Sequence, residues 1–191
     1  MKKTILLILI IFGFSLNVNA ENDRIVSGQN DAKITIIAYE SLTCSFCADF
    51  HNNIYPLLKK EFIDTGLVKI EFRHFPLDII ALNASKISQC RQDQSLEIMM
   101  SLYSDQQAWI KGKTIEEANE NLKKFVENKN FNLDFEKCIS DKKIEDFVLN
   151  DRIEGTKKFK VNSTPTIIIN DKKFEKTLNY KNLKKYLEKL V

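Results

Sequence analysis

The chain has 191 residues, of which 43% are hydrophobic and 29% are charged. This is the composition of a globular protein with one core, and it excludes a disordered polymer, a collagen-like repeat and a polytopic membrane protein. The formal charge is +3, but two of the positive charges belong to Lys2 and Lys3, which leaves +1 for the rest of the chain. A nearly neutral chain has no electrostatic attraction for anionic polymers or lipids, so we expect no nucleic-acid partner.

Residues 1–20 have the pattern of a secretory signal peptide. Lys2 and Lys3 precede an apolar run from Ile5 to Leu16, and Val18-Asn19-Ala20 is a small-residue cleavage site. The run is shorter than the roughly 20 residues that a membrane-spanning helix needs, so an uncleaved anchor is the weaker alternative. We therefore expect an exported chain in an oxidising compartment, where four cysteines can form two pairs.

A buried strand followed by a helix is predicted near the start of the exported part. Residues 34–39 are almost continuously apolar and β-rich, and from Ser45 to Phe62 the apolar residues recur at helical spacing. Pro56 lies inside that helix and predicts a kink. Alternating residues over 67–72 predict a second strand. The polar segment 21–31, ahead of these elements, is expected to be loosely ordered.

Residues 77–160 are predicted to be helical, with a break at Gly112. Their apolar residues fall on helix faces and are expected to form core rather than a cofactor site. After Pro165 the pattern changes again, because 166–169 is a short apolar run typical of a third buried strand. The turn residues Asn170-Asp171 predict a hairpin with 172–174, and the apolar spacing from Tyr180 to Leu190 predicts a closing helix.

The sharpest motif is Cys44-Ser45-Phe46-Cys47, which follows the first strand and opens the first helix. At a helix N-terminus, unsatisfied backbone N–H groups and the helix dipole favour a thiolate over a thiol, so Cys44 is the expected nucleophile. Cys47 lies one turn later, where it can form a disulfide with Cys44 or displace a partner from it. A dithiol with a stabilised thiolate holds its disulfide poorly, which predicts oxidation of other proteins.

Two other interpretations of this motif are weaker. A zinc site would need further ligands from Cys90, Cys138 or His51. The two cysteines are far apart in the sequence and not in a knuckle, and His51 is expected to face solvent or cap a contact. We therefore expect no metal. A purely structural Cys44–Cys47 disulfide would close too short a loop to stabilise the chain much.

The stretch from Ile36 to Cys47 resembles the active-site strand and helix of the DsbA family of periplasmic thiol–disulfide oxidoreductases, and most of all its alphaproteobacterial members. The blocks Phe72–Asp78 and Val161–Thr166 are similar to other blocks of that family, in the same order. The resemblance covers nearly all of the exported chain. It implies an α/β thioredoxin fold with a helical domain inserted between the second and third predicted strands.

The corresponding domain boundaries are a signal peptide over 1–20, thioredoxin-fold parts over 21–76 and 161–191, and the inserted helical domain over 77–160. By resemblance, Thr164-Pro165 is the cis-proline turn that faces the active-site disulfide and exposes the Thr164 backbone to substrate. Without the resemblance, a trans proline at the start of a strand would be favoured.

The chain departs from the family pattern in two places. Many DsbA proteins have Pro-His between the cysteines, and the histidine helps to stabilise the thiolate, whereas Ser45 and Phe46 add no positive charge here. We therefore expect a milder oxidant whose Cys44 pKa still lies below that of a free thiol. The family also tends to bury an acid six residues before the first cysteine, where Ala38 stands. Glu40 could take over proton transfer to Cys47, although an exposed loop position is the simpler expectation for it.

Cys90 and Cys138 both lie in the helical segment, within apolar-periodic stretches. In an exported protein the simplest interpretation is a structural disulfide between them, and some members of the resembled group carry one in this domain. A redox role for this pair is the weaker alternative.

These features predict a periplasmic dithiol oxidase with no cofactor beyond the Cys44–Cys47 disulfide. Its substrates would be exported proteins with free cysteines, and the resemblance implies reoxidation by a quinone-linked inner-membrane partner. A monomer is expected, since no dimerisation domain is evident between Ala20 and the first strand. The alternatives are an isomerase or reductase of the same fold, and an exported, non-catalytic binding module with structural disulfides.

Overall fold

The computed structural model describes residues 23–191, except for the side chain of Gln94. The predicted signal peptide, 1–20, lies outside this range. A five-stranded mixed sheet in the order β1-β3-β2-β4-β5 forms the centre of the molecule. Its strands are β1 (Ile25–Ser27), β2 (Ile34–Glu40), β3 (Val68–His74), β4 (Thr166–Ile169) and β5 (Lys172–Lys173). β2 and β3 are parallel, and every other neighbouring pair is antiparallel.

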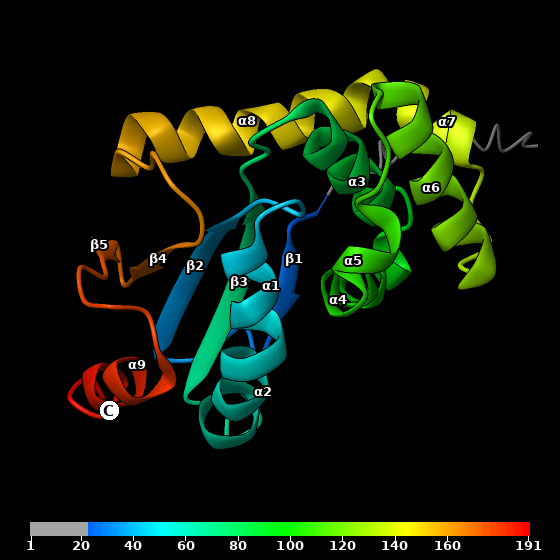
Figure 1. Ribbon diagram of the computed structural model, residues 1–191. Coiled ribbons are helices and arrows are strands. Elements are labelled where there is room, and N and C mark those ends of the chain that lie inside the picture. The colour runs from blue at the N-terminus through cyan, green and yellow to red at the C-terminus, as the bar shows by residue number, and fades with distance from the viewer. Residues whose placement is uncertain (1–22) are drawn as a thin grey trace, which may run out of the picture.

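The helix that follows β2 is nearly continuous, and Figure 1 shows it as one column in front of the sheet. It consists of α1 (Ser45–Asp49), the π-helical turn η1 (Phe50–Ile54), α2 (Tyr55–Leu58) and a second π-helical turn, η2 (Lys59–Ile63). The predicted helix from Ser45 to Phe62 is therefore confirmed. Pro56 lies in the first turn of α2, just after the wide turn of η1, where its missing N–H disturbs the helix least.

All the helices of the insert lie between β3 and β4, in the place expected from the sequence. They are α3 (Ile79–Gln89), the 3₁₀ turn η3 (Gln92–Gln94), α4 (Ser95–Ser104), α5 (Gln106–Trp109), α6 (Ile115–Asn128), α7 (Phe135–Ser140) and α8 (Lys142–Phe159). In Figure 1 α3 to α7 gather beside the sheet, and α8 runs back along the top to the strand edge where β4 begins. The fold is the α/β thioredoxin arrangement with a helical insertion.

Side-chain caps explain where several of these helices begin. Asp78 accepts a hydrogen bond from the Ala81 amide at the start of α3, and Thr114 accepts one from Glu117 at the start of α6. The closing helix α9 (Tyr180–Leu187) starts in the same way at Asn179. One continuous cluster of buried apolar residues extends from the sheet into the insert, where Trp109 and Leu102 are fully buried. No helix of the described range is long and apolar enough to cross a membrane.

The expectation that 21–31 is loosely ordered is wrong for its central part. Ile25–Ser27 forms β1, which pairs antiparallel with β3. Ile25 and Ser27 face inward, whereas Val26 is exposed, but three residues are too short for this alternation to stand out in a polar sequence. Because β1 precedes the two strands that were predicted, the helical insertion lies between the third and fourth strands in chain order, β3 and β4.

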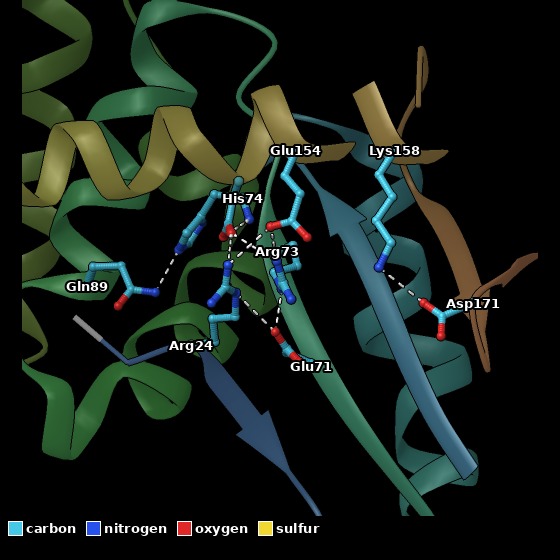
Figure 2. Close-up of polar contacts among 9 residues, drawn as sticks. Arg24, Glu71, Arg73, His74, Gln89, Glu154, Lys158 and Asp171 are labelled. Carbon is cyan, nitrogen blue, oxygen red and sulfur yellow. Dashed lines mark hydrogen bonds and ion pairs between the residues drawn. The ribbon is translucent and has the colours of Figure 1, made fainter. Parts of the chain in front are cut away.

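A network of charged side chains attaches β1 and β3 to α8 (Figure 2). The guanidinium groups of Arg24 and Arg73 both form ion pairs with Glu71, Asp151 and Glu154. Asp151 is almost completely buried and accepts a hydrogen bond from the His74 amide at 3.2 Å. Burial raises the pKa of Asp151 to about 6, and the two arginines oppose that rise. The network therefore fixes the end of β3, which leads to the site described next.

Candidate active site

Three segments meet at one end of the central strands, around the start of α1. β2 and β3 are parallel, so their C-terminal ends lie together here, where Glu40 pairs with His74. β4 is antiparallel to β2 and therefore begins at the same end of the sheet, where Thr166 pairs with Tyr39. The loop after β2, the loop after β3 and the turn before β4 therefore converge. These segments carry Cys44, Asp78 and Thr164-Pro165, respectively.

Cys44 is the N-cap residue of α1, as the sequence predicts. Its carbonyl oxygen accepts hydrogen bonds from the amides of Cys47 and Ala48, both at 3.1 Å. Its side chain is half-buried, and its Sγ donates to the Thr164 carbonyl oxygen at 3.3 Å. Cys47 is fully buried one turn later, and both cysteines are free thiols. Only Cys44 is therefore accessible to another molecule.

The surroundings shift the pKa values of the two thiols in opposite directions. The pKa of Cys44 falls to about 5, chiefly because the Cys47 thiol donates a hydrogen bond to its sulfur. Burial opposes this fall, whereas the Thr164 side chain and the backbone amides of Cys47 and Phe46 assist it. Burial raises the pKa of Cys47, and the bond to Cys44 and the charge of Glu40 raise it further. One thiol is therefore set up as a nucleophile and the other as a proton carrier.

The peptide bond between Thr164 and Pro165 is cis. This is the geometry that the family resemblance implies, and it differs from the trans bond that base frequencies alone would favour. The turn places the Thr164 carbonyl against the Cys44 sulfur. A polypeptide lying across Cys44 would therefore meet the backbone of Thr164.

The structure corrects the expectations for Glu40 and His51. Glu40 is not in an exposed loop, because it is the last residue of β2 and is only 3% exposed. His51 does not face solvent; it is buried in η1, with its Nε2 2.6 Å from Glu40 Oε2. The His51 ring stacks on Tyr103, and its Nδ1 lies 3.3 Å from Met100 Sδ. The faces of the His51 ring therefore lie in the core, while its Nε2 pairs with Glu40. Glu40 is the residue for which the sequence suggested a role in proton transfer.

Burial also changes the acid–base character of Glu40. It raises the pKa of the Glu40 carboxyl, and the neighbouring His51 offsets part of that rise. The other carboxyl oxygen, Oε1, is buried without a hydrogen-bond partner in the described part of the chain. A carboxyl with a raised pKa and a free oxygen can accept and return a proton.

Gln106 is a site residue that the sequence interpretation missed. It is buried in α5, and its side-chain amide donates to the carbonyl oxygens of Leu42, at 2.8 Å, and Cys44, at 3.1 Å. The insert therefore holds the loop that carries the nucleophile. Nothing in the sequence separates Gln106 from its exposed neighbour Gln107 except the spacing to the buried Trp109.

The two residues between the cysteines lie on the surface. Ser45 is exposed, and the Phe46 ring is 75% exposed. Neither is a cause of the low Cys44 pKa through its side chain, since the contribution of Phe46 comes from its backbone amide. The exposed ring instead adds apolar surface beside the nucleophile.

Cys90 and Cys138 are joined by a disulfide bond with a Cα–Cα distance of 5.5 Å. The bond connects the C-terminal end of α3 to α7, inside the insert. Because both sulfurs are consumed in this bond, they are not available to complete a zinc site with Cys44 and Cys47. Over residues 23–191, no group of three or more His, Cys, Asp or Glu side chains is arranged to hold a metal ion.

Comparison with known proteins agrees with this geometry. A family profile described as thioredoxin matches residues 20–189. The crystal structure of alpha-DsbA1 from Wolbachia pipientis superposes with a TM-score of 0.77 and 30% sequence identity, over 88% of this chain and 90% of that one. The chain belongs to the DsbA-like branch of the thioredoxin family.

Two named proteins are also similar to this DsbA-like chain in sequence. A putative protein-disulfide oxidoreductase of Rickettsia bellii is 27% identical over 161 residues, which is 82% of this chain and 61% of that protein. Disulfide bond formation protein D of Bacillus subtilis is 28% identical over 174 residues, which is 86% of this chain and 75% of that protein. The chain therefore spans less than two thirds of the length of the Rickettsia relative.

Proposed function

We propose that this DsbA-like chain is a thiol–disulfide oxidoreductase that donates the Cys44–Cys47 disulfide to exported proteins with free cysteines. The observation that carries the proposal is the difference between the two thiols. An accessible sulfur has a pKa lowered to about 5, and a buried sulfur one turn away has a raised pKa. A pair that stabilises the thiolate of its reduced form gives up its disulfide readily.

The reaction would proceed in two exchange steps. A substrate thiolate attacks Cys44 Sγ, a mixed disulfide forms, and the Cys44–Cys47 bond breaks with Cys47 leaving as a thiolate that takes up a proton. A second substrate thiol loses its proton and attacks the substrate sulfur of the mixed disulfide, and Cys44 leaves as a stable thiolate. The substrate gains one disulfide and loses two electrons, which the Cys44–Cys47 pair receives.

The surrounding residues would divide the remaining work. The backbone of Thr164, presented by the cis bond to Pro165, would align the substrate segment by strand-like pairing. Glu40, held by His51, would supply the proton that Cys47 takes up when it leaves. Ser45 and Phe46 would set the exposed surface at the point of attack, and the Cys90–Cys138 disulfide would stabilise the insert.

The setting of this reaction is part of the proposal. The signal-like residues 1–20 and the two cysteine pairs suit the periplasm, with the chain acting as a monomer. A quinone-linked oxidase of the inner membrane would reoxidise Cys44 and Cys47. The low pKa of Cys44 favours oxidation over the isomerase or reductase alternatives, because it stabilises the reduced enzyme.

Oxidation of a dithiol peptide tests the function directly. The oxidised protein is expected to convert the peptide to its disulfide, and Cys44→Ser is expected to abolish this reaction because the attacked sulfur is missing. Cys47→Ser should instead form a stable mixed disulfide at Cys44 with a peptide activated as a mixed disulfide, since no resolving thiol remains. If the wild-type protein did not exceed the uncatalysed rate of peptide oxidation, the chain would be a binding module with inert thiols. If it reduced insulin faster than it oxidised the peptide, it would be a reductase.

The role of Glu40 has its own test. Glu40→Gln keeps the shape and the bond to His51 but removes the exchangeable proton. We expect the release of Cys47 in stopped-flow peptide oxidation to slow by about 10²-fold, with loss of its pH dependence. Asp49→Asn, an exposed carboxylate on α1, serves as the control and should leave the rate unchanged. A Glu40→Gln variant that differs from wild type only in melting temperature would make Glu40 a purely structural residue.

A further inference from the structure

A methionine sulfur lies against the buried pair of Glu40 and His51. Met100 is on α4, and its Sδ is 3.3 Å from His51 Nδ1. The other ring nitrogen of His51, Nε2, is 2.6 Å from Glu40 Oε2. The charge of Glu40 in turn acts on Cys47, whose pKa it helps to raise. The thioether, the imidazole and the carboxyl therefore form one line of polar contacts that leads toward the cysteines.

Met100 is the member of this line that solvent reaches. Glu40 and His51 are 3% and 4% exposed, whereas the Met100 side chain is partly exposed. The preceding residue, Met99, points into the core and is 2% exposed. Met1 is the only other methionine of the chain, and it belongs to the predicted signal peptide. An oxidant that attacks methionine in the exported part therefore meets one accessible target.

The contacts of the two ring nitrogens indicate where the protons of the pair lie. A thioether sulfur can accept a hydrogen bond but cannot donate one, so the contact with Met100 calls for a hydrogen on His51 Nδ1. The separation of 2.6 Å between His51 Nε2 and Glu40 calls for a second hydrogen between these two atoms. When this second proton lies on the oxygen Glu40 is neutral, and when it lies on the nitrogen Glu40 is a carboxylate. The proton that Glu40 would deliver to Cys47 is therefore one that it shares with His51.

Oxidation of Met100 would change the group that faces His51 Nδ1. A peroxide transfers one oxygen atom to Sδ: the O–O bond breaks, the S–O bond forms, the sulfur loses two electrons, and hydrogen peroxide is reduced to water. The sulfoxide oxygen is a much stronger hydrogen-bond acceptor than the thioether sulfur, which is a weak one. A stronger acceptor at Nδ1 favours the positively charged ring, which draws the shared proton from Glu40 to Nε2. Glu40 is then left as a carboxylate.

A charged Glu40 hinders the step in which Cys47 leaves the disulfide. The carboxylate has no proton to give to the departing sulfur. Its negative charge also disfavours a thiolate at Cys47, because the two like charges repel each other in a buried site. Reduction of the sulfoxide by a methionine sulfoxide reductase removes the added oxygen and restores the original contact. The change at Met100 is therefore reversible.

We infer that Met100 is a reversible oxidation site for peroxides, and that its sulfoxide slows disulfide donation by acting through His51 on Glu40. The inference rests on the proposed function, because it requires Glu40 to supply the proton that Cys47 takes up. It adds a second oxidant to the chemistry of the chain, one that reacts with a thioether rather than with a thiol. Met100 acts here as a site of modification, and His51 carries its effect to the carboxyl.

The test uses the full chain with all four cysteines in disulfides, so that no thiol competes for hydrogen peroxide. Peroxide is expected to add one oxygen atom at Met100, which fragmentation mass spectrometry of the α4 peptide distinguishes from Met99. Oxidation of the dithiol peptide should then slow by about tenfold, less than the roughly 10²-fold expected for Glu40→Gln, because the carboxyl is still present. Treatment with methionine sulfoxide reductase, followed by renewed oxidation of the cysteines, should restore the rate.

Two adjacent methionines provide the matched variants, and each variant is compared with itself before and after peroxide. Met100→Leu should lose the response, because leucine fills a similar volume without an oxidisable sulfur. Met99→Leu should keep the response, because this side chain is buried. In Glu40→Gln, peroxide should still oxidise Met100 but should slow the reaction no further, since the carboxyl through which the sulfoxide acts is missing.

The remaining outcomes would each overturn a defined part of the account. Oxidation of Met100 without a change in rate, or a rate loss that persists in Met100→Leu, would overturn the inference alone. Equal slowing in wild type and Glu40→Gln, or a rate loss that parallels a fall in melting temperature, would assign the sulfoxide to a packing defect and also overturn it. If the untreated wild-type protein did not oxidise the peptide, the proposed function would fall, and the inference with it.

Discussion

The reduced protein is expected to react with iodoacetamide at Cys44 at a rate that reaches half its maximum near pH 5. The thiolate is the reacting species, and hydrogen bonds from the Cys47 thiol, from the Thr164 side chain and from the backbone amides of Cys47 and Phe46 stabilise it against the neutral thiol. Cys47 should stay unmodified because it is fully buried and its pKa is raised. Alkylation followed by mass spectrometry of the cysteine peptides measures the modification of Cys44 and of Cys47. The ultraviolet absorbance of the Cys44 thiolate gives an independent titration.

The sign of the effect on stability follows from the direction of the shift. Because the pKa of Cys44 is lower in the folded protein than in an unfolded chain, the thiolate stabilises the folded, reduced form at neutral pH. This stabilisation is fully present above the unfolded pKa of about 8.5 and is lost as the pH falls through about 5. The oxidised form has no such group, so the reduced form is favoured and the disulfide becomes oxidising.

Two measurements complete this prediction. Cys47→Ala should move the alkylation midpoint of Cys44 to higher pH, since the Cys47 hydrogen bond is the largest cause of the low pKa. The reduction potential against glutathione should lie above the value of about −270 mV for thioredoxin and below that of about −120 mV for DsbA, because no histidine assists the thiolate. A Cys44 midpoint at or above about 8.5 would refute the whole account of the site.

Removal of the second disulfide, by Cys90→Ser together with Cys138→Ser, is expected to destabilise the protein strongly. The two cysteines are 48 residues apart, and closing a loop of that length is worth up to roughly 4 kcal/mol in the chain-entropy treatment. The disulfide joins α3 to α7, so the loss falls on the insert that supplies Gln106. Urea unfolding of wild type and the double variant, both with Cys44 and Cys47 reduced, measures the difference in unfolding free energy.

The double variant also separates a structural role from a redox role. For a structural disulfide, the alkylation midpoint of Cys44 and the potential of its pair should stay at their wild-type values while stability falls. An exposed serine of α7 provides the matched control, because Ser140→Ala alters a hydroxyl bonded only to the backbone of its own helix. A changed potential with unchanged stability would assign Cys90 and Cys138 to electron relay.

The order of the longer elements could be predicted because each of these has a clear sequence period. The apolar runs of β2 and β4 and the helical spacing after Ser45 depend on local residues, and the structure follows them closely. β1 was missed because three residues carry too little periodicity, and it forms only through pairing with β3. Local pattern is informative where an element is long enough to have one.

The parts of the site that depend on tertiary contacts could not be predicted from the sequence in the same way. Cys44 and Cys47 are adjacent to a strand and a helix, so their position follows from local structure. The burial of Glu40 and His51 depends on Tyr103 and Met100, which come from a distant helix of the insert. Gln106 acts on the backbone of a loop 62 residues away, and no spacing rule connects the two.

The bonds made by Gln106 have a consequence for variation at the active site. Both of its acceptors, in Leu42 and Cys44, are main-chain oxygens, so this anchorage does not depend on which side chains the loop carries. Ser45 and Phe46 project into solvent and take no part in it. Redox strength can therefore be retuned by exchanging the dipeptide between the cysteines, in evolution or in the laboratory, while the scaffold that aims the sulfur remains as it is.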